Sequence, residues 1–400
     1  MATARKKKLT IVCDLGTSSN KILYCLGRTG AVKHLVTGSE YLNLGKTGSN
    51  NFVVTSGVGK PEDNCWLEYN NAIHLVGRLA DENKAGVSIK SLKYEMVVPK
   101  VLAIIGAIAV KEKLKTGFSV KLAILLPYGE MNDQRAIEVE LNKAVKDFKF
   151  QGQSYELELL GCDFIPEGYG ILSHYLRSRT VEYIQSSTLI VLMFGYRNTS
   201  LLVFEEGTLN SKLTNSTDFG FYNLSDAIIS KTSGLTRADI LGAITTKKDR
   251  KIVQGKGVDY IKTYINSSEL VKTTNASRAE SERMAIASAI REAKSQYWLM
   301  ITNWLNETLP PSKKVDDLIY TGGTSSIILE ELTSYLQSKY SSVAVCGTDV
   351  IENELLRELG LKDKSLDKFK SSQLPVRFTD PWGYFRELAH YNLRVLPDAA

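Results

Sequence analysis

The sequence predicts an α/β protein with mainly buried sheets and two halves of similar build. Hydrophobic residues make up 43% of the 400 residues and charged residues 24%, which is the balance of a globular protein with a large core. Short apolar runs alternate with segments of helical spacing, as in α/β architectures. A strand, a glycine turn and a second strand occur near the N-terminus and again near residue 190, which indicates an internal duplication.

The first half begins with two apolar runs, Leu9–Asp14 and Ile22–Leu26, separated by a Gly/Ser turn, so we expect a hairpin. Residues from about 30 to 95 hold Gly-rich turns and short strands, such as Asn51–Thr55 and Ala72–Val76, and predict an inserted small subdomain. The remaining elements expected in this half are a helix at Lys100–Leu114, a strand at Lys121–Leu126, a helix at Asp133–Phe148, an alternating strand at Tyr155–Leu160 and a helix at Tyr169–Arg177.

The second half repeats the hairpin with Thr188–Met193 and Ser200–Phe204. The elements expected after it are helices at Thr236–Thr246, Ala276–Leu309 and Ile327–Leu336, a strand at Leu318–Thr321, and short helices at Leu355–Leu359 and Pro381–His390. We therefore predict one lobe over residues 1–180, with its insert at about 30–95, and a second over 181–400, with a helical insert at about 220–310.

Composition excludes several classes of protein. The net charge of +6 is small for this length and does not imply nucleic acid. We interpret the basic run Arg5–Lys8 as a solvated tail, with a weak anionic contact as the alternative. The five cysteines are scattered without a C-x-x-C pair, which is typical of a reducing cytosol. The longest apolar run, Val97–Val110, is too short to span a bilayer, so no membrane insertion is expected.

The first hairpin turn gathers residues with phosphate-binding chemistry: Asp14, Gly16, Thr17, Ser18, Ser19 and Lys21. Gly16 lets backbone N–H groups approach an anion, and Lys21 adds a positive charge beside the hydroxyl donors. Asp14 can hold Mg²⁺ through water, because this ion keeps most of its hydration shell. A plain hairpin with a polar turn is the alternative interpretation.

Two shorter motifs have chemistry of their own. Thr321-Gly322-Gly323-Thr324-Ser325 lies between a strand and a helix, where glycines allow close approach of a flat ring or a phosphate. Pro166-Glu167-Gly168 is expected at the start of a helix, where the Glu167 carboxylate can orient an attacking water or accept its proton. The alternatives are a capped glycine turn and a carboxylate that stabilises the start of a helix.

Together, the order D-x-G-(T/S)-x-x-x-K, P-E-G, strand–G–turn–strand and T-G-G-T resembles the actin-like ATPase superfamily, and within it the plasmid-segregation proteins of the ParM/StbA type. Leu125-Leu126-Pro127 and Gly195-Tyr196-Arg197-Asn198-Thr199 also carry the resemblance, which runs from about Leu9 to about His390. It implies an actin-like ATPase fold, with two duplicated ribonuclease H-like lobes around a cleft that holds ATP or GTP with Mg²⁺.

The resemblance also implies a role for each motif. Asp14 matches the metal-side aspartate of the family, and Glu167 matches the carboxylate that positions the hydrolytic water. The matches to the binding loops are Gly16, Thr17, Ser18, Ser19 and Lys21 for the first phosphate loop, Gly195, Asn198 and Thr199 for the second, and Gly322, Gly323 and Thr324 for the adenosine side.

One position departs from the pattern. The second phosphate loop of the family usually opens with an aspartate, whereas this chain has Met193, which cannot ligate Mg²⁺ or assist a water. One interpretation is that Asp14 and Glu167 are enough to bind Mg²⁺ and orient the water without this aspartate. Alternatively, Arg197 or Asn198 takes over part of its role, or hydrolysis is slow.

The expected function is that of a cytoplasmic ATPase that polymerises and segregates plasmid DNA through a DNA-binding adaptor, without sequence-specific nucleic-acid binding of its own. Met193 motivates an alternative, a nucleotide-binding structural or adaptor protein of the same fold with little hydrolysis. A small-molecule kinase or phosphatase of the superfamily is disfavoured, because no carboxylate-rich acceptor site is evident in the sequence.

Overall fold

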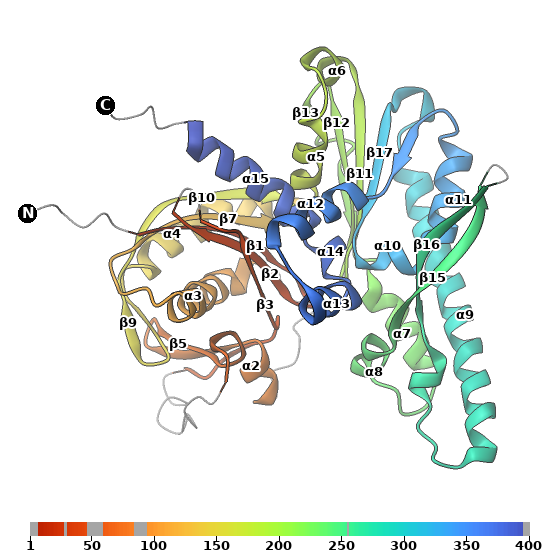
Figure 1. Ribbon diagram of the computed structural model, residues 1–400, viewed down its shortest axis with the longest axis horizontal. Coiled ribbons are helices and arrows are strands. Elements are labelled where there is room, and N and C mark those ends of the chain that lie inside the picture. Colours follow the sequence, from red (N-terminus) through yellow and green to blue (C-terminus); the bar gives the residue numbers. More distant parts are fainter. Residues whose placement is uncertain (1–6, 28–29, 46–58, 84–93, 254–255, 395–400) are drawn as a thin grey trace, which may run out of the picture. The chain divides into compact units, whose positions relative to one another are not determined.

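The computed structural model describes residues 7–27, 30–45, 59–83, 94–253 and 256–394 of the chain, which forms two compact units (Figure 1). Unit 1 comprises Met1–Ser178, Val350–Gly360 and Phe378–Ala400, and unit 2 comprises Arg179–Asp349 and Leu361–Arg377. The chain thus leaves unit 1 and returns to it twice. The two lobes expected from the sequence, with their inserts, are continuous ranges of residues, and this division stays a prediction.

A five-stranded sheet in the order β10-β7-β1-β2-β3 forms the centre of unit 1. Its strands are β1 (Lys8–Leu15), β2 (Asn20–Leu26), β3 (Lys33–Thr37), β7 (Ser119–Leu126) and β10 (Glu158–Pro166). Strands β1, β2 and β3 pair antiparallel, which confirms the predicted first hairpin, whereas β7 pairs parallel with both β1 and β10. The carboxyl ends of β1, β7 and β10 therefore lie at one edge of the sheet.

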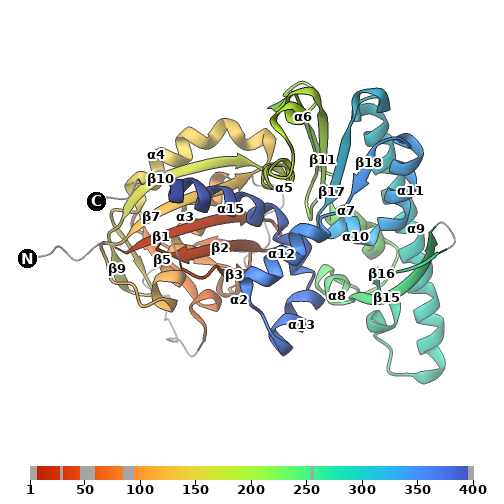
Figure 2. The same ribbon diagram turned by 45° about the horizontal axis from the view of Figure 1, so that its top comes forward.

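Helices cover both faces of this sheet. Helix α15 (Thr379–Arg394) packs on β1 and β2, as Figure 2 shows, and against α5 (Tyr169–Leu176). Helix α3 (Tyr94–Lys111) packs on β1 and on a second sheet, and it contacts α4 (Gln134–Ala144). Because α3 contacts both sheets, it is apolar nearly all round.

The second sheet of unit 1 is antiparallel, in the order β4-β6-β5-β8-β9. The elements of this region are β4 (Tyr41–Asn43), β5 (Cys65–Tyr69), β6 (Ala72–Val76), β8 (Phe148–Phe150), β9 (Gln153–Tyr155), α2 (Arg78–Glu82) and the 3₁₀ helices η1 (Pro61–Asp63) and η2 (Tyr128–Asp133). Helix α12 (Asp349–Leu359) also belongs almost entirely to unit 1.

The central sheet of unit 2 has the order β13-β12-β11-β17-β18, and β14 pairs with β12. Its strands are β11 (Thr188–Phe194), β12 (Thr199–Glu205), β13 (Thr208–Leu209), β14 (Asn215–Thr217), β17 (Asp317–Thr321) and β18 (Ala344–Cys346). Strands β11 and β12 form an antiparallel hairpin, and β17 runs parallel to β11 and β18. This is the pattern of β1, β2, β7 and β10, so the predicted duplication is confirmed.

The helices of unit 2 are α6 (Val181–Ser186), α7 (Phe221–Ser230), α8 (Arg237–Gly242), α9 (Ala276–Thr308), α10 (Gly323–Ile327), α11 (Leu329–Lys339), α13 (Asp363–Ser371), α14 (Leu374–Arg377), η3 (Ser267–Leu270) and η4 (Ser312–Lys314). The sequence analysis did not predict the separate antiparallel hairpin of β15 (Ile244–Val253) and β16 (Lys256–Ile265). In the part of the chain that the structure describes, no helix has the length and apolar character needed to cross a membrane.

Four sequence predictions need correction. The strand expected over Tyr155–Leu160 is divided between β9, which ends at Tyr155, and β10, which begins at Glu158. The helix expected over Asp133–Phe148 ends at Ala144, because Phe148 begins β8, in which buried and exposed residues alternate. The helix expected over Thr236–Thr246 ends at Gly242 and gives way to β15. The helix expected over Ile327–Leu336 is two helices, α10 and α11, divided at Ile328.

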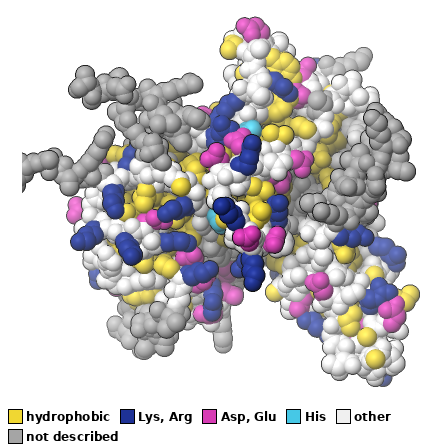
Figure 3. Space-filling model, viewed as in Figure 1, with side chains coloured by type: hydrophobic (Ala, Val, Ile, Leu, Met, Phe, Trp, Pro, Cys, Tyr) yellow, Lys and Arg dark blue, Asp and Glu magenta, His cyan; other side chains and the backbone are white. Residues whose placement is uncertain are grey.

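Two further expectations concern residues near the N-terminus and the turn before α5. The strand expected at Asn51–Thr55, and Arg5 and Lys6 of the basic run, lie outside the described residues. Pro166 ends β10 and α5 begins only at Tyr169, so Glu167 lies in the turn before the helix rather than within its first residues. On the face shown in Figure 3, the basic and acidic side chains of the described residues are interspersed.

Candidate functional site

The first phosphate-loop candidate joins β1 to β2 in unit 1. Asp14 and Lys21 are cross-strand neighbours, and the Lys21 amino group contacts Asp14 Oδ2 at 2.5 Å. Their side chains are only 13% and 10% exposed, respectively. The structure thus brings together the acidic and basic members of the predicted loop as a largely buried ion pair.

The turn between these two residues is tight. A Cβ added to Gly16 would lie 2.8 Å from the Ser19 carbonyl oxygen and 2.9 Å from Lys21 Nζ, so the turn has no room for a larger residue. The Thr17 carbonyl accepts a hydrogen bond from the Ser39 hydroxyl, and Ser19 is buried. The loop is therefore held by its own ion pair and by Ser39, which follows β3. Such a fixed backbone suits a preformed anion site.

Glu167 follows β10 at the same sheet edge as Asp14. Asp14 is in register with Leu125 of β7, and Leu125 is in register with Ile165 of β10. The Glu167 amide donates to the Leu126 carbonyl at 2.8 Å, which extends the β10–β7 ladder by one residue. Parallel pairing therefore brings both predicted catalytic residues, Asp14 and Glu167, to one edge of one sheet.

A third carboxylate, Asp380 at the start of α15, belongs to this group, and the sequence analysis missed it. The pKa of Asp380 is raised to about 7, chiefly by burial and also by the nearby carboxylates of Asp14 and Glu167, against the lowering effect of hydrogen bonds from the Gly168 and Gly170 amides. The only signal in the sequence was an aspartate near the start of a helix, because its partners are 210 or so residues away in the chain.

The second phosphate-loop candidate joins β11 to β12 in unit 2. The Gly195 amide donates to the Asn198 carbonyl at 2.8 Å, which closes the turn. The Thr199 hydroxyl donates to the Phe219 carbonyl at 2.6 Å. Thr199 is fully buried, so its side chain serves the structure of the loop in this conformation.

The adenosine-side candidate lies beside this loop in unit 2. Gly322 has φ of +96°, and a Cβ there would lie 2.2 Å from the Phe194 carbonyl oxygen, so only glycine fits. The Thr324 hydroxyl donates to the Gly195 carbonyl at 2.8 Å. The structure therefore brings Gly195, Gly322 and Thr324, three predicted site residues from distant parts of the sequence, into one cluster.

Met193 occupies in unit 2 the place that Asp14 occupies in unit 1. Asp14 lies opposite Lys21 and precedes the loop glycine by two residues, and Met193 lies opposite Ser200 with the same spacing to Gly195. Both side chains are partly exposed between fully or nearly fully buried neighbours. The ion pair of the first loop is thus replaced in the second by a methionine and a serine.

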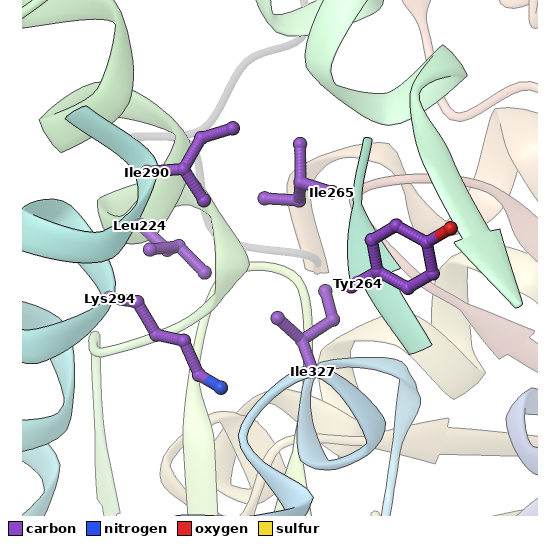
Figure 4. Close-up of a pocket in the computed structure, with 6 residues that line it drawn as sticks. All are labelled: Leu224, Tyr264, Ile265, Ile290, Lys294 and Ile327. Carbon is purple, nitrogen blue, oxygen red and sulfur yellow. The ribbon is translucent and has the colours of Figure 1, made fainter. Parts of the chain in front are cut away.

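A small cavity of unit 2 lies at α10, directly after the adenosine-side residues (Figure 4). Its lining residues are Leu224, Tyr264, Ile265, Ile290, Lys294 and Ile327. The aliphatic side chains point toward one another, whereas the Tyr264 hydroxyl points away from them. The Lys294 amino group pairs with Glu331 at 2.8 Å. The cavity is therefore apolar at its centre and polar at its margin.

Solved structures with a similar architecture are known, whereas no family model and no curated protein matches the sequence. Among solved structures, the apo ParM protein of pSK41 is 15% identical with a TM-score of 0.51, and 95% of this chain and 98% of that chain are covered. A ParM filament from Clostridium botulinum is 12% identical, with a TM-score of 0.53 and coverage of 94% and 99%.

The third comparison is with Ta0583, an archaeal actin homolog solved in complex with ADP. It is 13% identical, with a TM-score of 0.54, and 94% of this chain and 97% of that chain are covered. At such identities a likeness of structure shows the fold and nothing finer. Together with the two duplicated sheets and their hairpin loops, these likenesses show that the chain has the actin-like ATPase fold.

Proposed function

We propose that this chain binds ATP with Mg²⁺, hydrolyses it, and assembles with copies of itself into filaments. The observation that carries the proposal is the pair of tight glycine turns at equivalent places in two duplicated sheets. The first holds Asp14 and Lys21, and the second is joined to the Gly322–Thr324 turn through the Thr324 hydroxyl. Turns of this kind are suited to hold phosphate groups.

The residues of the first loop fit a magnesium phosphate group. Gly16 leaves the turn open where a Cβ would fill it, and Lys21 supplies a positive charge. Asp14 is a single carboxylate, which suits an ion that is bound by one or two carboxylates together with waters and phosphate oxygens. When bound, Mg²⁺ would neutralise the phosphate oxygens, and Asp14 and Lys21 would hold the metal and phosphate sides of the group.

For the base, we propose the cavity beside α10. An apolar lining suits the faces of a purine ring, and Gly323 and Thr324 lie just before Ile327 in the chain. At about 70 Å³ the cavity has room for about two waters. A base would therefore need the partly exposed side chains of Lys294 and Tyr264 to move.

Hydrolysis is assigned to Glu167. It is 7% exposed and lies at the same sheet edge as Asp14, where a carboxylate can orient a water against a phosphate held by the loop. Because Met193 offers no acidic group to the second loop, a nucleotide-binding protein with little hydrolysis is the second candidate. Arg197 and Asn198 of the same turn are the residues that could compensate.

Self-assembly is supported by the fold, which the chain shares with the ParM filament from Clostridium botulinum. The finer function, segregation of plasmid DNA in the cytoplasm through a DNA-binding adaptor, rests on the resemblance to ParM-type proteins. A nucleotide-driven filament would then couple the state of the phosphate loops to contacts between copies.

Sedimentation and electron microscopy with ATP, GTP, their slowly hydrolysed analogues and no nucleotide test the proposal. Phosphate release is measured in the same samples. We expect pelleted filaments with ATP and its analogue, and phosphate release with ATP only. Filaments without phosphate release would favour the second candidate, and a chain that neither binds nucleotide nor pellets would exclude both.

A further inference from the structure

Asp380 contacts the turn that carries Glu167. One oxygen of its carboxylate accepts the Gly168 amide at 2.6 Å, and the other accepts the amides of Gly170 at 2.8 Å and Ile171 at 3.3 Å. Asp380 itself is only 4% exposed. Gly168, the residue before α5, has no side chain with which to cap the helix. A residue from the far end of the chain therefore supplies the cap.

The backbones of α5 and α15 touch at this point. A Cβ added to Gly170 would lie 2.1 Å from the Asp380 carbonyl oxygen, and one added to Gly383 would lie 1.9 Å from the Gly170 carbonyl oxygen. Only glycine allows such a close approach. The contact leaves Asp380 little freedom to move sideways relative to the first turn of α5.

The peptide groups on both sides of Glu167 are consequently fixed. Its own amide donates to the Leu126 carbonyl of β7, and the next amide in the chain, that of Gly168, donates to Asp380. The first bond belongs to the sheet that carries Asp14, and the second belongs to α15. With both anchors in place, the Glu167 Cα is held relative to the first phosphate loop.

We propose that Asp380 is a positioning residue for Glu167. It holds the turn so that the Glu167 carboxylate meets the attacking water in line with the phosphate, and it does not itself contact the nucleotide. This inference rests on the proposed function, in which Glu167 orients that water. A purely structural cap predicts a different result, because it would affect folding and nucleotide binding together.

The test compares the Asp380→Asn variant with the wild-type chain. An asparagine side chain keeps the volume but has a single acceptor oxygen, so one arm of the contact is lost. We expect kcat for ATP hydrolysis to fall by roughly 10- to 100-fold, because small displacements of a catalytic group have large effects on rate. The Kd for Mg-ATP should stay within about twofold, because Lys21 and its loop are untouched.

Glu387→Gln is the matched control. Glu387 of α15 accepts a hydrogen bond from Ser173 of α5, so this change weakens the same helix contact away from the Glu167 turn. We expect it to leave kcat and Kd unchanged. The double variant Asp380→Asn with Glu167→Gln should hydrolyse ATP no more slowly than Glu167→Gln alone, because Asp380 acts through Glu167.

Additive losses in the double variant, or a parallel loss of binding and kcat in Asp380→Asn, would overturn the inference. If that variant does not fold, Asp380→Ser with the same measurements replaces it. Hydrogen exchange at the Gly168 and Gly170 amides reports the contact independently of activity, and faster exchange is expected in the Asp380 variants only. A wild-type chain that fails to hydrolyse ATP refutes the proposed function and this inference together, whereas normal wild-type hydrolysis with an additive double variant refutes this inference alone.

Discussion

Asp14 and Met193 hold equivalent places in two sheets of the same topology, yet they give the two turns different electrostatics. The first turn carries a carboxylate and an amino group at 2.5 Å, and the second carries neither charge at these positions. At the residue scale the two phosphate-loop candidates are therefore unequal in charge. Most of the charged chemistry that could act on a phosphate lies in unit 1, with Asp14, Lys21 and Glu167.

The first prediction concerns Lys21. Lys21→Ala should weaken Mg-ATP binding by about 10- to 100-fold, the usual worth of a charge-assisted hydrogen bond. Lys33→Ala is the control, because Lys33 also forms an ion pair in unit 1, with Glu112 at 2.7 Å, but is half-exposed. Fluorescence titration with labelled ATP measures both variants. Equal affinities for the two folded variants would remove Lys21 from the site.

The second prediction concerns Met193. Met193→Asp places a carboxylate at the position equivalent to Asp14, partly exposed, where Mg-ATP can stabilise it. Thermal melts should show a variant that Mg-ATP stabilises more than it stabilises the wild type. Leu192→Asp is the control, since the fully buried neighbour gains an unpaired charge that costs several kcal/mol or more whether or not ligand is present. A Met193→Asp variant that behaves like this control would contradict the assignment.

The third prediction follows from the pKa of Asp380. This pKa is raised from 3.8 to about 7 in the folded chain, so the folded state binds the proton more tightly than the unfolded state does. The contribution of Asp380 to stability is therefore largest at low pH and is lost as the pH rises from about 4 to about 7. Melting temperatures measured without metal at pH 5 and pH 7.5 should differ less in Asp380→Asn than in the wild type. An unchanged difference would show that another group dominates this pH range.

At the element scale, the turns after β11 and β17 decide how the second loop is built. The strand β17 ends at Thr321, and α10 starts two residues later, with Gly322 between them. The close approach of Gly322 to Phe194 lets the Thr324 hydroxyl reach the Gly195 carbonyl. One glycine thus ties the adenosine-side turn to the second phosphate-loop candidate.

The fourth prediction tests this turn. Gly322→Ala combines an unfavourable φ with a backbone clash, so it should lower the free energy of unfolding by more than about 3 kcal/mol. Gly234→Ala is the control in the same unit. Gly234 has φ of +77° but nothing within 4 Å of an added Cβ, so about 1–2 kcal/mol is expected. Chemical denaturation measures both, and equal losses would show that the clash relaxes at little cost.

Prediction from sequence worked where periodicity was strong. The two hairpins, α9 and the loop glycines follow from apolar runs and turn residues, and the structure has them at nearly the expected residues. Prediction failed for β15, because its run of charged residues lacks the alternation of a strand. It also failed for α10, a short helix whose start depends on the close packing of Gly322 on Phe194. Asp380 was missed because its partners are fixed by the packing of α15 on α5, which is a long-range contact.

At the scale of the whole molecule, the two duplicated sheets show that the fold is built from one repeated plan, whereas the candidate catalytic groups are not repeated. The turn of Glu167 is anchored on both sides, and Asp14 pairs with Lys21. The positions of unit 2 that are equivalent to Asp14 and Lys21 hold Met193 and Ser200 instead. Under the proposed function, hydrolysis and assembly should therefore be separable, because a change confined to this turn should lower turnover and leave the surfaces between copies in place.

The fifth prediction follows from this separation. Glu167→Gln should slow ATP hydrolysis by roughly 10²- to 10⁴-fold, the usual effect of losing a general base, while filaments still form and persist longer. Glu158→Gln, at the other end of β10, is the control and should behave as the wild type. Phosphate release and light scattering over time follow both variants. A Glu167→Gln variant with normal turnover would identify Glu167 as an ordinary carboxylate before a helix.

The return of the chain to unit 1 has a consequence for synthesis. Helix α15 covers β1 and β2, yet it is translated after the whole of unit 2. Domains made early generally fold as they leave the ribosome, but this unit cannot cover one face of its first hairpin until unit 2 has been translated. A nascent chain that stalls before Phe378 would expose an apolar sheet face and lack the cap of α5. It would therefore be a substrate for chaperones and proteases until α15 has been made.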